Sequence, residues 1–233
     1  MSDDILGRLA NETGLVAVET MAESATDAPL EQLLTLHLHH FPDHAHVGDE
    51  LRLARRVGPH DPDVIIHAWL LHVDSVPVGF VIFHTNLRRR IVLQHFVGMD
   101  EDTREQLPFR WISHLSDAVV ETGVLDAETH GLELLGAMGE NPPQHEAAWH
   151  RLGYRTIDVD YREPNHGMHW AEFGPITYFP MTAMVRLTTA GDQVPFDQVA
   201  TAAVSAFLLD HYQLPADDPT VTAILARAAA LPS

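Results

Sequence analysis

Residues 91–97 read IVLQHFV, a run that is almost continuous in apolar and aromatic residues. Such a run is typical of a strand that is buried on both faces, in the centre of a sheet covered by helices. Two more strand-like runs precede it, at residues 64–73 and 77–84. The turn residues Asp74 and Ser75 stand between them, so the two runs are predicted to form a hairpin. A hairpin that feeds a central strand limits the fold to one built on a sheet.

The other elements are predicted from the spacing of apolar residues. We expect strands at residues 16–20, 132–138, 155–161 and 178–187, and helices at residues 30–41, 49–56, 102–123, 142–152, 196–212 and 219–230. Gly123 is the expected stop of the helix that follows the central strand. The order predicts an α/β fold, with a mixed, mostly antiparallel central sheet flanked by helices. Residues 1–190 would form this domain, and residues 191–233 a C-terminal helical extension.

The charged residues limit the chemistry. Asp and Glu number 33 against 14 basic residues, all of them arginine, so the formal net charge is −19. Without lysine or cysteine the chain cannot form a disulfide, a Cys-ligated zinc site, a thiol nucleophile, a Schiff base or a Walker-type P-loop. The acidity disfavours nucleic acid and acidic membranes and favours cationic partners. The N-terminus is acidic where a signal peptide is basic, and no apolar run could span a bilayer, so we expect a cytoplasmic protein.

Three segments, in this order, resemble segments of the GCN5-related N-acetyltransferase (GNAT) superfamily. Residues 77–80 (PVGF) are similar to the family's VGF strand. Residues 97–99 (VGM), followed by Arg104, are similar to the strand and turn that lead into its acyl-CoA loop. Residues 149–154 (WHRLGY) are similar to its YEKLGF segment. The resemblance covers roughly residues 15–188 and leaves the last helices outside.

The resemblance implies an N-acyltransferase that uses acetyl-CoA or another acyl-CoA as co-substrate. Two neighbouring parallel strands would splay apart, and the gap would accept the pantetheine arm as if it were a strand. Backbone N–H groups at the next helix N-terminus would hold the pyrophosphate. A small-molecule amine would then attack the thioester directly. The acyl-CoA-binding positions that it implies are Phe96, Val97, Met99, Arg104, Gln106, Leu107, Phe109, Arg110, Asn141 and Trp149.

The acyl-CoA loop departs from the family pattern. Leu107 and Phe109 stand at the two glycine positions, with Pro108 between them. Glycine lets the backbone approach a phosphate closely, whereas these side chains crowd it and proline lacks an N–H group. Trp149 stands where the family often has the tyrosine that protonates the thiolate, and Asn141 lies one residue further from it than the family spacing. These changes leave open a GNAT-like module that binds a ligand or a protein without catalysis.

Two residues are candidates for the general base. His95 interrupts the central strand and has a suitable unperturbed pKa near 6.5, although a hydrogen-bonded core histidine would give the same pattern. Glu133 interrupts the predicted strand at residues 132–138, where it could serve as a base or anchor the amine, or could simply face water.

Two histidine-rich segments allow a metal site, but their pattern does not favour one. His37, His39, His40, His44 and His46 could bind a metal through imidazole or could form a solvated helix end. Glu163, His166, His169 and Glu172 are spaced by three in a loop that Pro164 and Gly167 interrupt. We therefore expect no metal, and the loop could instead cover the acceptor site. The two terminal helices could pack on a second subunit, which predicts a homodimer.

Overall fold

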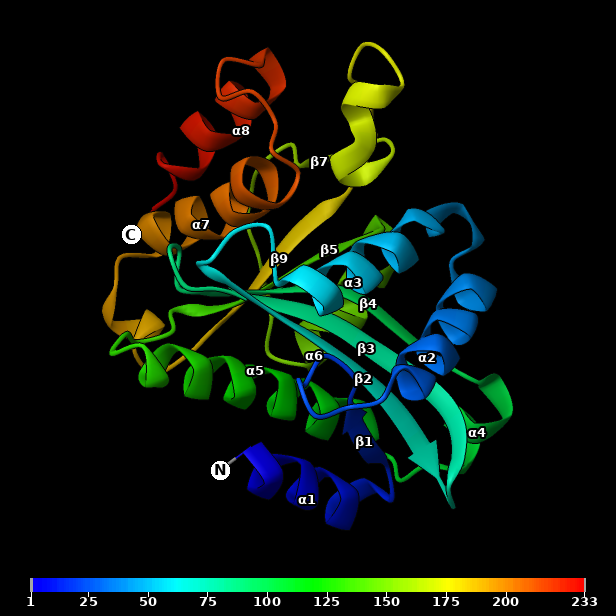
Figure 1. Cartoon of the computed structure of the whole chain (residues 1–233). Coiled ribbons are helices and arrows are strands. Elements are labelled where there is room, and N and C mark those ends of the chain that lie inside the picture. Colours follow the sequence, from blue (N-terminus) through cyan, green and yellow to red (C-terminus); the bar gives the residue numbers. More distant parts are fainter. Residues whose placement is uncertain (1, 233) are drawn as a thin grey trace. The chain divides into compact units, whose positions relative to one another are not determined.

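The computed structural model describes residues 2–232 and confirms the predicted fold class (Figure 1). The strands are β1 (Val16–Glu19), β2 (Val64–Val73), β3 (Val76–Asn86), β4 (Ile91–Met99), β5 (Gly136–Asn141), β6 (Arg155–Thr156), β7 (Arg162–Pro164), β8 (Tyr178–Pro180) and β9 (Thr182–Leu187). The α-helices are α1 (Ser2–Thr13), α2 (Asp27–His40), α3 (His46–Val57), α4 (Glu101–Gln106), α5 (Trp111–Thr129), α6 (Glu146–Arg151), α7 (Phe196–Ser205) and α8 (Pro219–Ala228). A π-helix, η5 (Ala206–His211), continues α7.

The chain divides into two compact units that share strand β4. The first contains residues 2–85 and 95–126, and the second contains residues 86–94 and 127–232. Strands follow in the order β1-β2-β3-β4 and β4-β5-β9-β6, which gives a seven-stranded sheet, and β7 pairs with β8 separately. Strand β1 is antiparallel to β2, and β9 is antiparallel to both β5 and β6, whereas β4 and β5 run parallel.

In the first unit, helices cover both faces of the sheet. Leu30, Leu33 and Leu34 of α2 pack with Ala68 and Leu70 of β2 in one core cluster. The side chain between them on the strand, Trp69, points to the other face because strand side chains alternate. Helices α1 and α5 lie side by side, joined by an ion pair from Arg8 to Glu121 and a 2.7 Å contact between His114 Nδ1 and Glu12 Oε2.

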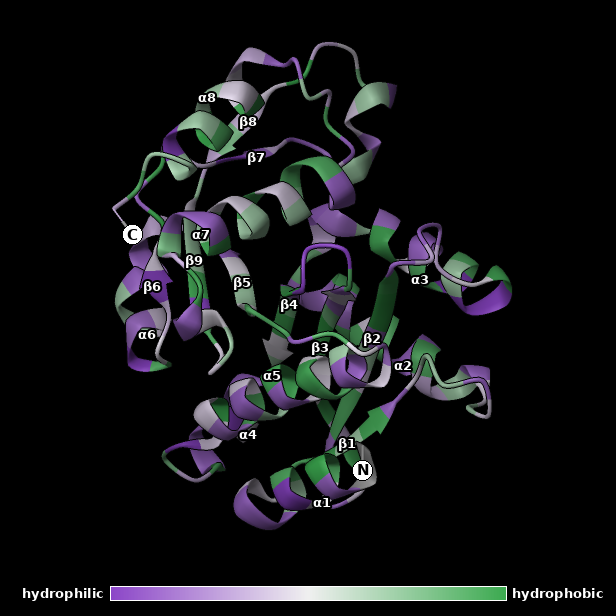
Figure 2. Cartoon of the chain, turned by 90° about the vertical axis from the view of Figure 1, so that its left-hand side faces the viewer, coloured by the Kyte–Doolittle hydropathy of each residue, from purple (hydrophilic) through white to green (hydrophobic). Residues whose placement is uncertain are grey.

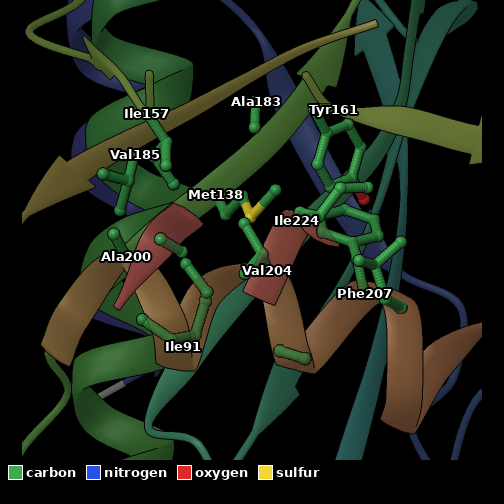
Figure 3. Close-up of a cluster of buried hydrophobic side chains, with 14 of the residues drawn as sticks. Ile91, Met138, Ile157, Tyr161, Ala183, Val185, Ala200, Val204, Phe207 and Ile224 are labelled. Carbon is green, nitrogen blue, oxygen red and sulfur yellow. The ribbon is translucent and has the colours of Figure 1, made fainter. Parts of the chain in front are cut away.

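In the second unit, the C-terminal segment is part of the hydrophobic core. Val199, Val204 and Phe207 are fully buried, and they pack with Met138 of β5 and Val185 of β9 (Figure 3). Helix α8 joins the same cluster through Val221, Ile224 and Ala228. Figure 2 shows β9 as a mainly hydrophobic strand beside helices that carry both kinds of residue. The segment predicted as an extension therefore completes this unit's core.

Several predicted boundaries were wrong. The helix expected at 102–123 is two helices, because Leu107-Pro108 interrupts it, and Gly123 lies inside α5, which continues to Thr129. Proline lacks the N–H group that a continuous helix needs. The strand expected at 132–138 begins only at Gly136, and the strand expected at 155–161 spans two residues.

The strand expected at 178–187 is also two strands. Strand β8 ends at Pro180, and β9 begins at Thr182 in the other sheet. Helix α1, which buries Ile5 and Leu9, was not predicted. None of the described helices has the length and apolar character that crossing a bilayer requires.

Candidate functional site

The parallel pair β4–β5 is where the sequence places the acyl-CoA site. Its register begins with Ile91 opposite Gly136 and ends with Gln94 opposite Gly139. Strand β4 then continues to Met99, whereas β5 continues along β9 to Asn141. The segment of β4 that carries Phe96, Val97 and Met99 thus lies beyond the last residue pair that β4 shares with β5 in the described register.

The glycines of the two β-strand motifs are required by contacts between β3 and β4. A Cβ atom on Gly79 would lie 2.5 Å from the carbonyl oxygen of Gly98 and 3.1 Å from the sulfur of Met99. A Cβ atom on Gly98 would lie 2.4 Å from the ring of Phe80. Only glycine fits at such distances. The PVGF and VGM segments are therefore explained by close packing of these strands.

The candidate base His95 is half-buried on β4, in the first unit. Its ring centroid lies 4.3 Å from that of His84 on β3. Its neighbour Phe96 points into an aromatic group with His37, Phe41 and His44, at centroid distances of 4.8, 5.0 and 5.2 Å. The residue as a whole is half-buried, but the Nε2 atom of its ring is shielded from solvent.

The loop before α5 differs from an open phosphate-binding loop. The N–H groups of Trp111 and Ser113 donate to the carbonyls of Pro108 and Arg110, at 2.9 and 3.0 Å. Two donors at this helix N-terminus are therefore already used. Phe109 is 98% exposed. The loop offers cationic groups and an apolar surface rather than a cradle of free amides.

The polar side chains of that loop are exposed. Arg104 lies 3.3 Å from Glu101 within α4, and Gln106 Nε2 donates to the carbonyl of Asp102 at 3.1 Å. Arg110 is exposed beside Phe109. Exposed ion pairs of this kind are weak, so the Arg104 guanidinium can exchange its partner for a phosphate at little cost.

In the second unit, five residues gather at the last pair of β4 and β5. The hydroxyl of Tyr154 donates to Gln94 Oε1 at 2.8 Å, and its ring meets that of Trp149 edge-on at 4.6 Å. Trp149 and Asn141 both lie against Gly139, where a Cβ atom would meet them at 3.1 and 3.3 Å. Among the described residues, the buried Asn141 Nδ2 has no hydrogen-bond partner. Asn141 and Trp149, which the resemblance had singled out, therefore lie close together, and the Asn141 amide N–H group is an unused hydrogen-bond donor.

Glu133, the other candidate base, is exposed in the loop before β5. It precedes Gly136, the first residue of the strand, whereas pairing with β4 ends at Gly139, at the opposite end. It therefore does not interrupt a strand, because the strand begins after it.

A carboxylate that the sequence did not single out is held by two tyrosines. Glu140 follows Gly139 on β5, and its two oxygens accept hydrogen bonds from the hydroxyls of Tyr161 and Tyr212. Both tyrosines are almost fully buried, at 1% and 4% exposure. Glu163 on β7 lies close enough for its charge to raise the pKa values of Glu140 and Tyr212. We call these four residues the Glu140 cluster.

Burial dominates the electrostatics of the Glu140 cluster. It raises the pKa of Glu140 well above its usual value, and the nearby charge of Glu163 raises it further. Burial likewise raises the pKa of Glu163. The pKa values of Tyr161 and Tyr212 are raised well above 10, first by burial and then by Glu140. These groups bind protons more tightly than they would in water.

The sequence could not reveal the Glu140 cluster, since its members are separated by up to 72 residues. Helix η5 places Tyr212, whose N–H group donates to the carbonyl of Phe207 at 2.8 Å across five residues. The indole N–H group of Trp170, in the loop predicted to cover the acceptor site, donates to the carbonyl of Tyr212 at 2.9 Å.

The two histidine-rich segments do not form the metal sites considered above. Among residues 2–232, the five histidines at 37–46 do not converge as a group that could hold an ion. In the loop, His169 Nδ1 contacts Glu172 Oε1 at 2.8 Å and His166 stacks on Phe173, whereas Glu163 belongs to the Glu140 cluster. The members of that second segment have different neighbours.

His37 is a buried neutral histidine. It is 1% exposed, and among the described residues its Nε2 atom has no hydrogen-bond partner. Burial lowers its pKa to about 4. As the pH falls below 6.5, His37 therefore becomes protonated in the unfolded chain but stays neutral in the folded chain.

We expect the free energy of unfolding to fall as the pH is lowered from 6.5 to 4, by about 3 kcal/mol from His37 alone. Urea unfolding across that range measures it. The variant His37→Phe should flatten the fall, whereas His39→Phe, at an exposed position of the same helix, should leave it unchanged. An equal acid dependence in all three proteins would contradict the assignment.

Comparisons with known proteins give likeness in structure only. No family model matches the chain, and no curated protein matches it. A spermidine N-acetyltransferase chimera from Vibrio cholerae aligns at 12% identity and TM-score 0.49, over 78% of this chain and 99% of that one. An acyl-CoA N-acyltransferase from Pseudomonas aeruginosa aligns at 16% identity and TM-score 0.44, over 74% of this chain and 97% of that one. A Bacillus subtilis acetyltransferase solved with CoA aligns at 12% identity and TM-score 0.45, over 75% of this chain and 99% of that one.

The order and direction of the strands identify the fold class without any comparison. Helices flank a seven-stranded, mostly antiparallel sheet, and its parallel pair β4–β5 stops pairing at Gln94 and Gly139. The predicted order of the three motifs falls on β3, on β4 with its following turn, and on α6 with its following turn. The chain thus has the mixed, mostly antiparallel α/β sheet flanked by helices that its sequence predicted.

Proposed function

We propose that the chain is an acyl-CoA-dependent N-acyltransferase, most simply an acetyltransferase, that acts on a small or cationic amine. The observation that carries the proposal is the end of the β4–β5 pairing at Gln94 and Gly139, while β4 continues to Met99. A strand that continues past its neighbour offers backbone donors and acceptors to an extended arm. The ordered motifs on the same elements support this assignment.

The proposed roles follow from where each residue lies. The backbone of Phe96, Val97 and Met99 would pair with the pantetheine arm. The buried Asn141 amide has an unused donor, which fits a carbonyl oxygen of the same kind of ligand. His95 would take a proton from the attacking nitrogen. Glu133 receives no role, because it lies at the far end of β5 from Gly139.

The residues that would bind the pyrophosphate of CoA match the family pattern less well. Arg104 and Arg110 would supply charge, with Gln106 as a further donor, but Leu107 and Phe109 occupy the glycine positions. Two amides of the α5 N-terminus are already bonded. We therefore expect the acyl arm to contribute more of the affinity than the pyrophosphate does.

Replacing both Leu107 and Phe109 with glycine should tighten acetyl-CoA binding about tenfold, because a freed amide can then form a charge-assisted hydrogen bond with a phosphate. Titration calorimetry measures the change. S-acetylpantetheine, which lacks the pyrophosphate and the phosphorylated adenosine of acetyl-CoA, is the control and should bind both proteins equally. An unchanged acetyl-CoA affinity would show that the loop does not touch the pyrophosphate.

The reaction itself is tested by the release of free CoA thiol from acetyl-CoA, measured with a panel of diamines and monoamines. Turnover that depends on the amine supports the proposal. Binding of acetyl-CoA without turnover for any amine would instead favour a non-catalytic ligand-binding or interaction module. Trp149 favours that second function, because an indole cannot protonate a thiolate, as does Phe109, which presents an apolar ring to solvent. The predicted homodimer would be tested by light scattering.

A further inference from the structure

The second unit contains a cavity of about 400 Å³ beside helix α8, and the proposed function does not use it. One side of the cavity is a stripe of α8, on which Thr220, Ala223 and Arg227 recur at helical spacing. Arg162 of β7 and Tyr178 of β8 also line it. Figure 2 shows these two short strands close to α8. The volume falls within the range of small-molecule pockets, roughly 300–1,000 Å³.

The register of the small sheet places Arg162 and Tyr178 together. Arg162 pairs with Pro180, and Pro164 pairs with Tyr178, so these side chains share one face of the sheet. The hydroxyl of Tyr178 is shielded from solvent. Burial and then Asp218 raise the pKa of that hydroxyl, which therefore stays neutral. Tyr178 thus offers the cavity its ring rather than a charged group.

Two arginines bring hydrogen-bond donors to the cavity. Nε and Nη2 of Arg162 both donate to Asp160 Oδ2, at 3.1 and 2.9 Å. Nε of Arg227 donates to the carbonyl oxygen of Asp158 at 3.1 Å, and its Nη2 donates to the carboxylate of the same residue. A guanidinium has five N–H groups. In each arginine these bonds take two of the five, and none of them involves Nη1.

The cavity also contains a negative group and an apolar surface. Asp160 lines it, and both bonds from Arg162 end on Oδ2 rather than on Oδ1. The pair is largely exposed, so it is weak and orients the two groups without saturating them. Ile224, which is 3% exposed, lies on the apolar side of the lining with the ring of Tyr178. The lining therefore combines both signs of charge with apolar side chains.

We propose that this cavity binds a zwitterion of the α-amino acid type with an apolar side chain. The ligand's carboxylate accepts hydrogen bonds from Nη1 of Arg162 and of Arg227, because guanidinium groups match carboxylate oxygens. Its ammonium group donates to Asp160, and its side chain lies against Ile224 and the ring of Tyr178. An anion without the ammonium group would meet Asp160 uncompensated, in a chain whose net charge is −19.

This site goes beyond the proposed function, because binding here involves no acyl transfer. Ile224 lines the cavity and also belongs to the core cluster that contains Met138 of β5 and Val185 of β9. A ligand that binds only the folded chain stabilises it by mass action. The amino acid should therefore raise the temperature of thermal unfolding, and the rise should grow with its concentration.

Three related probes separate the parts of the ligand. L-phenylalanine carries both charges, 3-phenylpropanoate lacks the ammonium group, and 2-phenylethylamine lacks the carboxylate. NMR titration of the full-length protein with L-phenylalanine at pH 7.5 should give saturable shifts in the amides of Ala223, Ile224 and Arg227. We expect a dissociation constant of about 1 mM. Each of the other two probes should bind about tenfold more weakly, because one charged group of the cavity then loses its partner.

Variants test the assigned contacts. Arg162→Gln and Arg227→Gln should each weaken L-phenylalanine binding about tenfold, because each removes donors to the carboxylate. The matched control is Arg155→Gln. Arg155 is another exposed arginine beside an aspartate, Asp192 at 3.8 Å, but it does not line the cavity, so this variant should bind as the wild type does. Ala223→Phe keeps both arginines and fills the cavity, so it should abolish binding and serves if an arginine variant fails to fold.

Equal affinity for L-phenylalanine and 3-phenylpropanoate would overturn the proposal, as would equal weakening in all three glutamine variants. Shifts that do not saturate at high-millimolar L-phenylalanine, or that persist in Ala223→Phe, would overturn it as well. Acetyl-CoA should bind Arg162→Gln and the wild type equally. A wild type that binds L-phenylalanine but no acyl-CoA would refute the proposed function and leave the amino-acid site standing.

Discussion

Replacing His67 with alanine is expected to lower the free energy of unfolding by about 3–5 kcal/mol, the usual effect of breaking a buried ion pair. His67 lies between two carboxylates of the first unit, with Nδ1 2.7 Å from Glu19 Oε2 and Nε2 3.0 Å from Asp126 Oδ2. Trp69 and Thr85 donate to the same two carboxylates, at 3.0 and 2.6 Å. Without the imidazole, both carboxylates would lose the buried cation that lies between them. Urea unfolding measures the difference.

The matched control is His114→Ala. His114 also contacts a glutamate at 2.7 Å, but both side chains are partly exposed, at 31% and 44%, whereas the His67 side chain is 14% exposed. Exposed pairs contribute less than about 1 kcal/mol. An equally small effect for His67→Ala would show that the buried imidazole is uncharged or that water enters the network.

The pH dependence gives a second test of the same group. The hydrogen bonds to Asp126 and Glu19 outweigh burial and raise the pKa of His67 to about 9. A raised pKa means that the stabilisation is complete below pH 6.5 and is lost as the pH rises through 9. We expect a loss of about 3 kcal/mol over that range in the wild type and little in His67→Ala. The combined stabilisation from His37 and His67 is therefore expected to be largest near pH 6.5.

Replacing Phe207 with alanine should destabilise the second unit by about 3–5 kcal/mol, the range for a buried aromatic side chain. Phe207 is 0% exposed in the π-helix η5 and packs near Tyr212, with ring centroids 6.0 Å apart (Figure 3). Removing the ring leaves a cavity in the core that the C-terminal segment shares with β5 and β9. Thermal and urea unfolding measure the loss.

Phe109→Ala is the control for the same change of side chain. Its ring is 98% exposed, so its removal should change stability by less than about 0.5 kcal/mol. If Phe207→Ala were equally mild, the C-terminal segment would contribute little to the stability of this core. The two outcomes differ by several kcal/mol and are easily separated.

The fold was predictable where a local pattern determines the structure. Strand β4 is recognisable because its apolar run is long and continuous, and α8 because Val221, Ile224 and Ala228 repeat at helical spacing. Strand β5 was misplaced because Leu132, Leu134 and Leu135 look more strand-like than Gly136, Ala137 and Gly139, which form it. The small residues are needed where other groups approach, such as Trp149 at Gly139.

The candidate site was predictable only where it resembles a motif. Asn141 and Trp149 both lie against Gly139, and the sequence had singled out both, together with Leu107 and Phe109, only through the resemblance. Glu140 was not recognisable, because its partners come from the linker before β7 and from the end of η5. No spacing in the sequence records that these residues meet.

We expect the protein to bind an acyl-CoA despite its altered loop. Calorimetric titration of the wild-type protein with acetyl-CoA and with longer acyl-CoAs is the decisive measurement. We expect saturable binding of one molecule per chain, and binding of acetylpantetheine as well. No heat of binding up to millimolar acyl-CoA would contradict it.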